Sequence, residues 1–212
     1  MTHKWMLPEK KFCFIAVPKC GSTSIIGTIF RDRIREAPEP EVYHAGISQV
    51  LKKHPEVESY FKCGFVRNPW DRIVSGYYDG IQAKDHIQVW SSGLSKYKSF
   101  SHFVLDLPNS RWKEWVHFAP CSNFLTVDGE VAVDFVGRIE TFEDNYIYLC
   151  DKLGVTIPSK SHDKDVMENA KWISHARQSL READYRKYYN SKTKEIIREL
   201  YKEDIERFGY EF

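Results

Sequence analysis

The stretch FCFIAVPKCGSTS, residues 12–24, decides the fold of this 212-residue chain. Six mostly apolar, strand-forming residues lead into a Pro-Lys-Cys-Gly turn, and Ser-Thr-Ser then opens a helical pattern. Along one face of that helix we expect five apolar residues: Ile25, Ile26, Ile29, Phe30 and Ile34. The stretch therefore predicts a buried strand, a tight turn and a helix in direct succession.

The turn has the features of an anion-binding loop. The first backbone N–H groups of a helix have no internal partner, and the helix dipole adds partial positive charge there. Gly21 lets the backbone approach a ligand oxygen closely, and Lys19 contributes a full positive charge. Hydroxyl donors come from the next three residues: Ser22, Thr23 and Ser24. We therefore expect this loop to bind a phosphate or a similar group.

The loop differs from the common nucleoside-triphosphate loop. That pattern is G-x-x-x-x-G-K-[ST], in which the lysine directly precedes the helix and the hydroxyl residue is placed for magnesium. Here Lys19 precedes Gly21 and the loop is shorter. A plain glycine turn between a core strand and a helix, with Lys19 solvated, is the alternative interpretation of this loop taken alone.

Length and composition indicate one ordinary globular domain over residues 1–212. Hydrophobic residues make up 42% of the chain and charged residues 29%, which is typical of globular proteins. The 31 Lys and Arg residues against 30 Asp and Glu residues give a net charge of +1, so no bulk charge favours a nucleic-acid partner. Any preference for anions must come from local placement.

Targeting and cysteine patterns favour a reducing cytoplasm. The first residues contain no apolar signal-peptide core, and no apolar run approaches the roughly 20 residues of a membrane helix. The five cysteines are scattered and odd in number, and no C-x-x-C pair or Cys/His cluster suggests a metal site. A luminal fragment cut from its anchor would show the same features. The oligomeric state is unknown.

A second strand, turn and helix follow the first. YFKCGFV, residues 60–66, has the apolar pattern of a core strand, and Arg67 lies at its carboxyl end. In the turn RNPWDR, Asn68 fits the helix N-cap, Pro69 the first helical position, and Asp71 the acid of a capping box. The chain thus repeats its opening arrangement with a second basic turn.

The rest of the chain alternates between strand and helix patterns. We expect a third strand at 131–137 and helices at 47–53, 100–107, 140–153, 180–189 and 193–208. Strands that alternate with helices imply an α/β fold with a parallel sheet. In such sheets, ligands bind beyond the carboxyl ends of the strands, where both basic turns fall.

Two segments, VPKCGSTS and FVRNPWDRIVSGYY, resemble the cofactor motifs of the sulfotransferase family that includes carbohydrate 2-O-sulfotransferases and many bacterial relatives. Two later segments, VDFVGRIETFEDNYIYLCDKLG and YYNSKTKEIIRELYKEDIERFGY, are similar to later parts of that family. The resemblance covers most of the chain and is weakest at about residues 85–123. It implies a single α/β domain with a P-loop-like parallel sheet flanked by helices, and 3′-phosphoadenosine 5′-phosphosulfate (PAPS) as the sulfuryl donor.

The resemblance also implies roles for individual residues in both turns. The 5′-phosphosulfate would be held by Lys19, Gly21, Ser22 and Thr23, with Cys20 and Ser24 in the same loop. Arg67 and Ser75, about two turns into the second helix, would hold the 3′-phosphate, because a dianion suits a guanidinium fork plus a hydroxyl. Cys20 stands where the family more often has Thr or Ser. We interpret it as a small filler, although a thiol beside Lys19 and a helix N-terminus would be mildly acidified.

Sulfuryl transfer needs an in-line attack and a group that meets the growing charge on the leaving phosphate. Lys19 is the obvious group, and no metal is expected. The acceptor hydroxyl needs a general base. His44 lies where the resembling 2-O-sulfotransferases place a catalytic histidine, and a neutral imidazole accepts a proton at neutral pH. A structural role for His44, and Glu41 or His86 as the base, stay open.

Five further residues are candidates for contact with ligands. Arg72 is expected either to pair with Asp71 or nearby Glu residues, or to contact the cofactor, and Arg138 lies at a strand end near the same cleft. Three tryptophans offer flat surfaces for sugars, although core packing is the expected use of at least two of them: Trp90, Trp112 and Trp115. His117 fits a core position better than a catalytic one.

The sequence-based hypothesis is a sulfotransferase that moves a sulfuryl group from PAPS to a hydroxylated small molecule or oligosaccharide. A small nucleotide kinase on a related sheet is the first alternative, but the G-K-[ST] pattern and a clear magnesium-binding acid are missing. The second alternative is a non-catalytic 3′,5′-nucleotide-binding protein.

Overall fold

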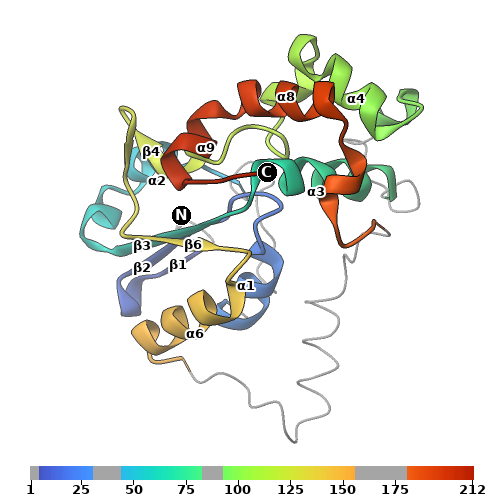
Figure 1. The fold of residues 1–212 in the computed structure, drawn as a ribbon. Helices are drawn as coiled ribbons and strands as arrows, with labels where there is room; N and C mark the ends of the chain where they lie inside the picture. Colours follow the sequence, from blue (N-terminus) through green and yellow to red (C-terminus); the bar gives the residue numbers. More distant parts are fainter. Residues whose placement is uncertain (1–4, 31–43, 83–92, 156–180) are drawn as a thin grey trace, which may run out of the picture. The chain divides into compact units, whose positions relative to one another are not determined.

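The computed structural model of the chain describes residues 5–30, 44–82, 93–155 and 181–212 (Figure 1). It contains two compact units, each built from two separate stretches of chain. The first unit comprises Met1–Val66 and Cys121–Ala176, and the second comprises Arg67–Pro120 and Arg177–Phe212. The loop at Lys19 therefore belongs to the first unit, whereas Arg67 and Ser75 belong to the second.

The first unit is built on a four-stranded sheet with strand order β1-β2-β3-β6. Its strands are β1 (Met6–Leu7), β2 (Phe12–Ile15), β3 (Phe61–Val66) and β6 (Phe135–Arg138). β2, β3 and β6 are parallel, with Ile15 opposite Gly64 and Val66 opposite Arg138, and β1 is antiparallel to β2. The predicted α/β class is confirmed, and the short antiparallel strand at the sheet edge is a feature that the sequence pattern does not predict.

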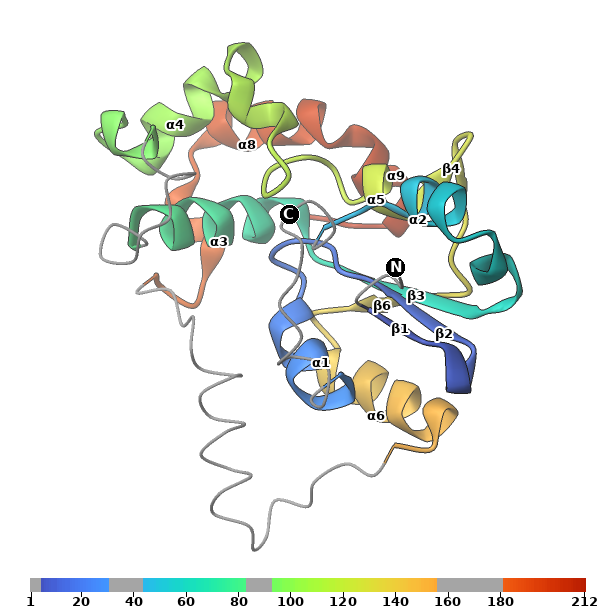
Figure 2. The same ribbon diagram turned by 180° about the vertical axis from the view of Figure 1, so that it is seen from behind.

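Helices cover both faces of this sheet (Figures 1 and 2). α1 (Ser22–Ile29) and α6 (Phe142–Leu153) lie on one face, and α2 (Ile47–Lys53) lies on the other beside the short α5 (Ser122–Leu125). The unit also contains the hairpin of β4 (Thr126–Val127) and β5 (Glu130–Val131) and the 3₁₀ turns η1 (Pro8–Lys10) and η4 (Pro55–Ser59). The expected sheet flanked by helices is thus present in this unit.

The described part of the second unit is helical and holds an aromatic core. Its α-helices are α3 (Pro69–Gln82), α4 (Phe100–Asp106), α8 (Ser191–Leu200) and α9 (Lys202–Phe208). Its 3₁₀ turns are η7 (Leu94–Lys96), η8 (Leu107–Asn109), η9 (Arg111–Glu114) and η10 (Tyr185–Tyr188). The buried aromatic rings of the core are Trp70, Tyr77, Tyr97, Phe100, Phe103, Trp112, Phe118 and Tyr201. Burial of these rings supplies the main driving force for packing α3 against α4 and α8.

Three predicted elements differ from the structure. The strand expected at 131–137 is divided between β5 and β6, and the helix expected at 180–189 is only the single turn η10 in its described part. The helix expected at 193–208 begins earlier and is interrupted at Tyr201, whose backbone leaves helical geometry (φ −116°, ψ 25°). The Tyr201 hydroxyl donates to the Phe118 carbonyl at 2.5 Å, so packing fixes the interruption.

Within the described ranges, no helix has both the length and the apolar character needed to cross a membrane. The extent of a single domain over residues 1–212 stays a prediction, as does the cytoplasmic location.

Candidate active site

The predicted anion-binding loop joins β2 to α1 in the first unit. Lys19 and Gly21 both have left-handed backbone conformations, with φ of 65° and 75°. A side chain at Gly21 would also displace its neighbours, because a Cβ there would lie 2.6 Å from Ile139 Cδ1 and 3.2 Å from Phe142. Packing against β6 and α6 is thus a second reason for glycine, beside the ligand approach expected from the sequence.

The backbone of this loop presents a row of N–H groups. The Ser24 and Ile25 N–H groups both donate to the Gly21 carbonyl, at 3.1 and 3.3 Å, and so begin the helical ladder. Among the residues that the structure describes, the N–H groups of Gly21, Ser22 and Thr23 have no acceptor. Three neighbouring donors at the N-terminus of α1, two residues from a lysine, are suited to an anionic oxygen.

The hydroxyl groups of the loop have different roles. Ser22 is buried, and its Oγ donates to the Val17 carbonyl at 2.8 Å, which ties the end of the loop to its start. In this conformation Ser22 offers a ligand its backbone N–H rather than its hydroxyl hydrogen. Thr23 is exposed and Ser24 is half-buried, so their hydroxyls are the side-chain donors that the loop can present to solvent.

Cys20 is fully buried beneath the loop, with its Sγ 3.9 Å from that of Cys121. Its burial agrees with the interpretation of a small filler residue. All five cysteines are buried, and none forms a disulfide. Burial raises the pKa of the Cys13 thiol to about 12 and that of Cys63 well above its ordinary value, so both are neutral residues of the sheet core.

His44 is held beside the start of the same loop. Its Nδ1 lies 2.7 Å from the carbonyl oxygen of Ala16, the residue that follows β2. A carbonyl can only accept, so Nδ1 carries a hydrogen, and in the neutral ring the lone pair is then on Nε2. A backbone contact that fixes the tautomer and the ring orientation is typical of histidines that act through the other nitrogen. The alternative bases Glu41 and His86, and also Trp90, lie outside the described residues.

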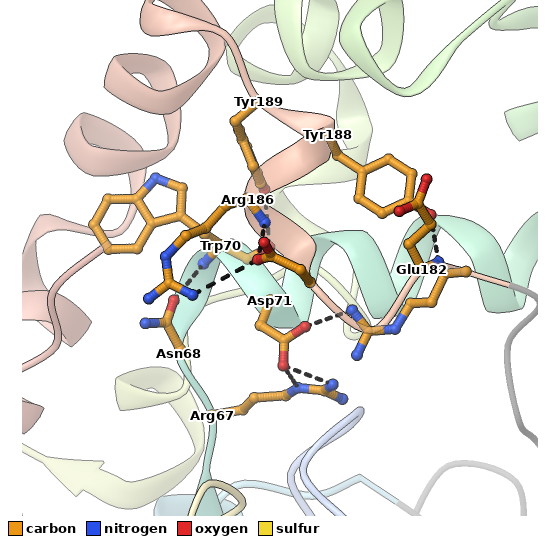
Figure 3. Close-up of polar contacts among 10 residues, drawn as sticks. Arg67, Asn68, Trp70, Asp71, Glu182, Arg186, Tyr188 and Tyr189 are labelled. Atoms are coloured by element: carbon orange, nitrogen blue, oxygen red, sulfur yellow. Dashed lines mark hydrogen bonds and ion pairs between the residues drawn. The ribbon is translucent and has the colours of Figure 1, made fainter.

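The second predicted turn begins the second unit and leads into α3. Asn68 is the N-cap as predicted, because its Oδ1 accepts from the Trp70 N–H at 3.1 Å. The Asn68 amide also donates to the Glu211 carbonyl at 2.7 Å, which fastens the C-terminal residues to the start of α3. Figure 3 shows Asn68, Trp70 and Asp71 around this helix start.

Asp71 is an ion-pair partner rather than the capping-box acid expected from the sequence. Arg67 donates to Asp71 Oδ2 through Nε at 2.8 Å and Nη2 at 2.7 Å (Figure 3). Arg181 donates to Oδ1 through Nη1 at 2.5 Å. All three side chains are only 13–16% exposed. One carboxylate therefore holds two guanidinium groups, one on each oxygen.

Ser75 lies one helical turn beyond Asp71 on α3. Residues four apart share a side of a helix, so the hydroxyl is on the side of α3 that carries Asp71. Ser75 is 7% exposed, and among the described residues its hydroxyl has no hydrogen-bond partner. Arg67, Asp71 and Ser75 thus follow one another at intervals of four residues.

The structure also describes the surroundings of three other candidates. Arg72 is 1% exposed and donates through Nη1 to the Ala119 carbonyl at 2.6 Å, so the expected pair with Asp71 is wrong. Trp112 is 2% exposed in the aromatic core, where it meets Trp115 edge-on at 6.1 Å. Core packing, the use expected for at least two of the three tryptophans, is therefore confirmed for Trp112. Arg138 ends β6, where its backbone N–H donates to Asn145 Oδ1 at 3.3 Å.

A parallel sheet whose first core strand opens into a basic, N–H-rich loop is an arrangement suited to binding phosphate esters or similar anions. The chain belongs to the sulfotransferase family, whose pattern matches residues 2–211. The motif resemblance found in the sequence is therefore confirmed.

Curated relatives support the same family. Carbohydrate sulfotransferase 10 of Xenopus laevis is 24% identical over 261 residues, which cover 95% of this chain and 65% of the relative. The protein of that name from Gallus gallus is 24% identical, covering 95% and 64%, and the one from Homo sapiens is 24% identical, covering 69% and 51%. The chain thus spans less than two thirds of the length of these relatives. No solved structure matches it.

Proposed function

We propose that this chain is a sulfotransferase that moves a sulfuryl group from PAPS to a hydroxyl group of a carbohydrate. The observation that carries the proposal is the loop of residues 19–24, which combines a lysine, three backbone N–H donors at the start of α1 and exposed hydroxyls. Membership of the sulfotransferase family indicates that the anion bound by this loop is the phosphosulfate of a sulfuryl donor.

The two halves of the donor would be bound by different motifs. The 5′-phosphosulfate would meet the charge of Lys19, the hydroxyls of Thr23 and Ser24, and three backbone donors: Gly21, Ser22 and Thr23. Buried Cys20 would support the loop from beneath. The 3′-phosphate would be bound by Arg67 and Ser75. These are charge-assisted and hydroxyl contacts, which are the usual ligands of a phosphate dianion.

The transfer itself would use His44 and Lys19. The acceptor oxygen forms a bond to sulfur while the bond from sulfur to the 5′-phosphate oxygen breaks, and the acceptor proton moves to Nε2 of His44. The leaving phosphate gains negative charge, which Lys19 and the backbone donors meet. No step in this chemistry calls for a metal. Among the described residues, no group of three or more His, Cys, Asp or Glu side chains is placed to hold one.

A sulfuryl-transfer assay tests this function. We expect incubation with PAPS and a panel of oligosaccharides to give products heavier by one sulfuryl group, and the rate to survive EDTA. Sulfation confined to phenols or amines would overturn the carbohydrate acceptor. Magnesium-dependent phosphoryl transfer from ATP would favour the kinase alternative. Binding of the nucleotide without turnover would favour the alternative of a non-catalytic nucleotide-binding protein.

The 3′-phosphate contact gives a separate prediction. Arg67→Ala should weaken binding of 3′-phosphoadenosine 5′-phosphate by about 2–4 kcal/mol, because a charge-assisted pair is lost. Affinity for adenosine 5′-monophosphate, which lacks the 3′-phosphate, should stay nearly constant. Calorimetry on both nucleotides measures the difference, and Arg198→Ala, an exposed arginine of α8, is the control for loss of one positive charge. Equal affinity of the unmodified protein for the two nucleotides would refute the assignment of Arg67.

A further inference from the structure

The ion pair between Arg67 and Asp71 reduces the positive charge that Arg67 offers to the proposed 3′-phosphate. Both Nε and Nη2 of Arg67 donate to one carboxylate oxygen, at 2.8 and 2.7 Å. With both side chains largely buried at such a distance, the Asp71 carboxylate offsets part of the positive charge that Arg67 offers to a nearby ligand. Arg67 in this pair still makes a charge-assisted contact, but it attracts a phosphate dianion less strongly than an isolated guanidinium would. A second cation would strengthen the binding of a dianion at this position.

Arg181 is that cation within the same unit. Its Nη1 contacts the other oxygen of Asp71, so the three side chains together carry one net positive charge. Arg181 is only 13% exposed. Among the described residues, it donates one hydrogen bond, which Asp71 accepts. A guanidinium has five N–H donors, so most of the donors of Arg181 are left for another acceptor.

Asp71 also holds the guanidinium groups of Arg67 and Arg181 in fixed orientations. Arginine side chains lose considerable rotamer freedom when they bind a ligand, and a contact that already holds them reduces that loss. The carboxylate binds one edge of Arg67 and one nitrogen of Arg181, on opposite oxygens. Ser75 adds a hydroxyl one turn further along α3.

We propose that Arg181 is a second guanidinium ligand of the 3′-phosphate, and that Asp71 positions Arg181 and Arg67 for it. The inference rests on the proposed function, because it assumes a ligand with a 3′-phosphate. A purely structural salt bridge between residue 181 and α3 is the competing explanation. It predicts an effect on stability but no effect on the preference for 3′-phosphorylated nucleotides.

Calorimetry on the full chain separates the two explanations. Affinities for 3′-phosphoadenosine 5′-phosphate and for adenosine 5′-monophosphate are measured for the unmodified protein, Arg181→Ala, Arg181→Lys and Arg198→Ala. We expect Arg181→Ala to bind the bisphosphate about 10- to 100-fold more weakly, with monophosphate affinity within about twofold. Arg181→Lys should fall between, because lysine keeps the charge but lacks the fork. Arg198→Ala should change neither affinity.

Three other results of the calorimetry would contradict a role for Arg181 in binding the 3′-phosphate. Arg181→Ala with an unchanged ratio of the two affinities, or with both affinities reduced equally, would overturn the role of Arg181 while leaving the proposed function intact. If Arg181→Ala does not fold, Arg181→Lys decides, since an unchanged ratio there rejects the need for a guanidinium. An unmodified protein with no preference for the bisphosphate would overturn the roles of both Arg181 and Arg67, and this measurement is made before any variant is prepared. The proposed function is overturned separately, by the absence of sulfuryl transfer in the assay with PAPS.

Discussion

His44→Ala should lower kcat by about 10²- to 10⁴-fold while the affinity for 3′-phosphoadenosine 5′-phosphate stays the same. The contact from Nδ1 to the Ala16 carbonyl at 2.7 Å places the lone pair on Nε2, which is the atom a general base needs. Ala16 lies between β2 and the loop that carries Lys19, so His44 is fastened to the backbone that leads into the anion site. Loss of the imidazole removes the proton acceptor and leaves the donor site in place.

Two variants make this test sharper. His44→Asn keeps a side-chain N–H that can reach a carbonyl but has no basic nitrogen, so it should lose as much kcat as His44→Ala if the residue is the base. His54→Ala removes a histidine at the end of α2 that pairs with Glu56, and it should change kcat by less than about twofold. Activity of His44→Ala within a few-fold of normal, or a collapse of nucleotide binding, would make His44 structural. The search for the base would then move to Glu41 and His86.

Local sequence signals predict the two turns because each turn is determined by neighbouring residues. An apolar strand, a left-handed glycine and helix-opening residues are contiguous at 12–24, and Asn68 caps α3 through its own near neighbours. Parallel pairing of β2, β3 and β6 then follows from alternation of strands and helices along the chain. These features need no knowledge of distant contacts.

Long-range contacts explain what the sequence does not predict. Asp71 has the right spacing for a capping box, but Arg67 and a residue 110 positions later take its two oxygens. No local pattern marks Arg181 as a functional residue. The sequence periodicity predicts a helix at 180–189, but in the described residues that segment contains only the single turn η10. Trp112 is similarly ambiguous, since an aromatic side chain fits both a sugar and a core, and only packing against Phe118 decides.

Lys19→Ala should lower kcat by about 10²- to 10³-fold and raise the KM for PAPS much less. Charge on the leaving phosphate oxygen grows during the transfer, so a cation at the loop stabilises the transition state more than the bound donor. Lys19 is half-buried two residues before Gly21, beside the N–H groups at the start of α1.

The backbone of Lys19 calls for a specific control. Its φ of 65° is left-handed, so a substitution there could act through the loop conformation rather than through the charge. Lys11 is an exposed lysine with φ of 45° at the end of η1, and Lys11→Ala removes a charge from a similar conformation outside the loop. We expect Lys11→Ala to keep normal kcat and Lys19→Arg to restore part of it. A Lys19→Ala protein with unchanged kcat and only weaker PAPS binding would show that Lys19 positions the donor and that the backbone donors of α1 carry the stabilisation of the leaving group.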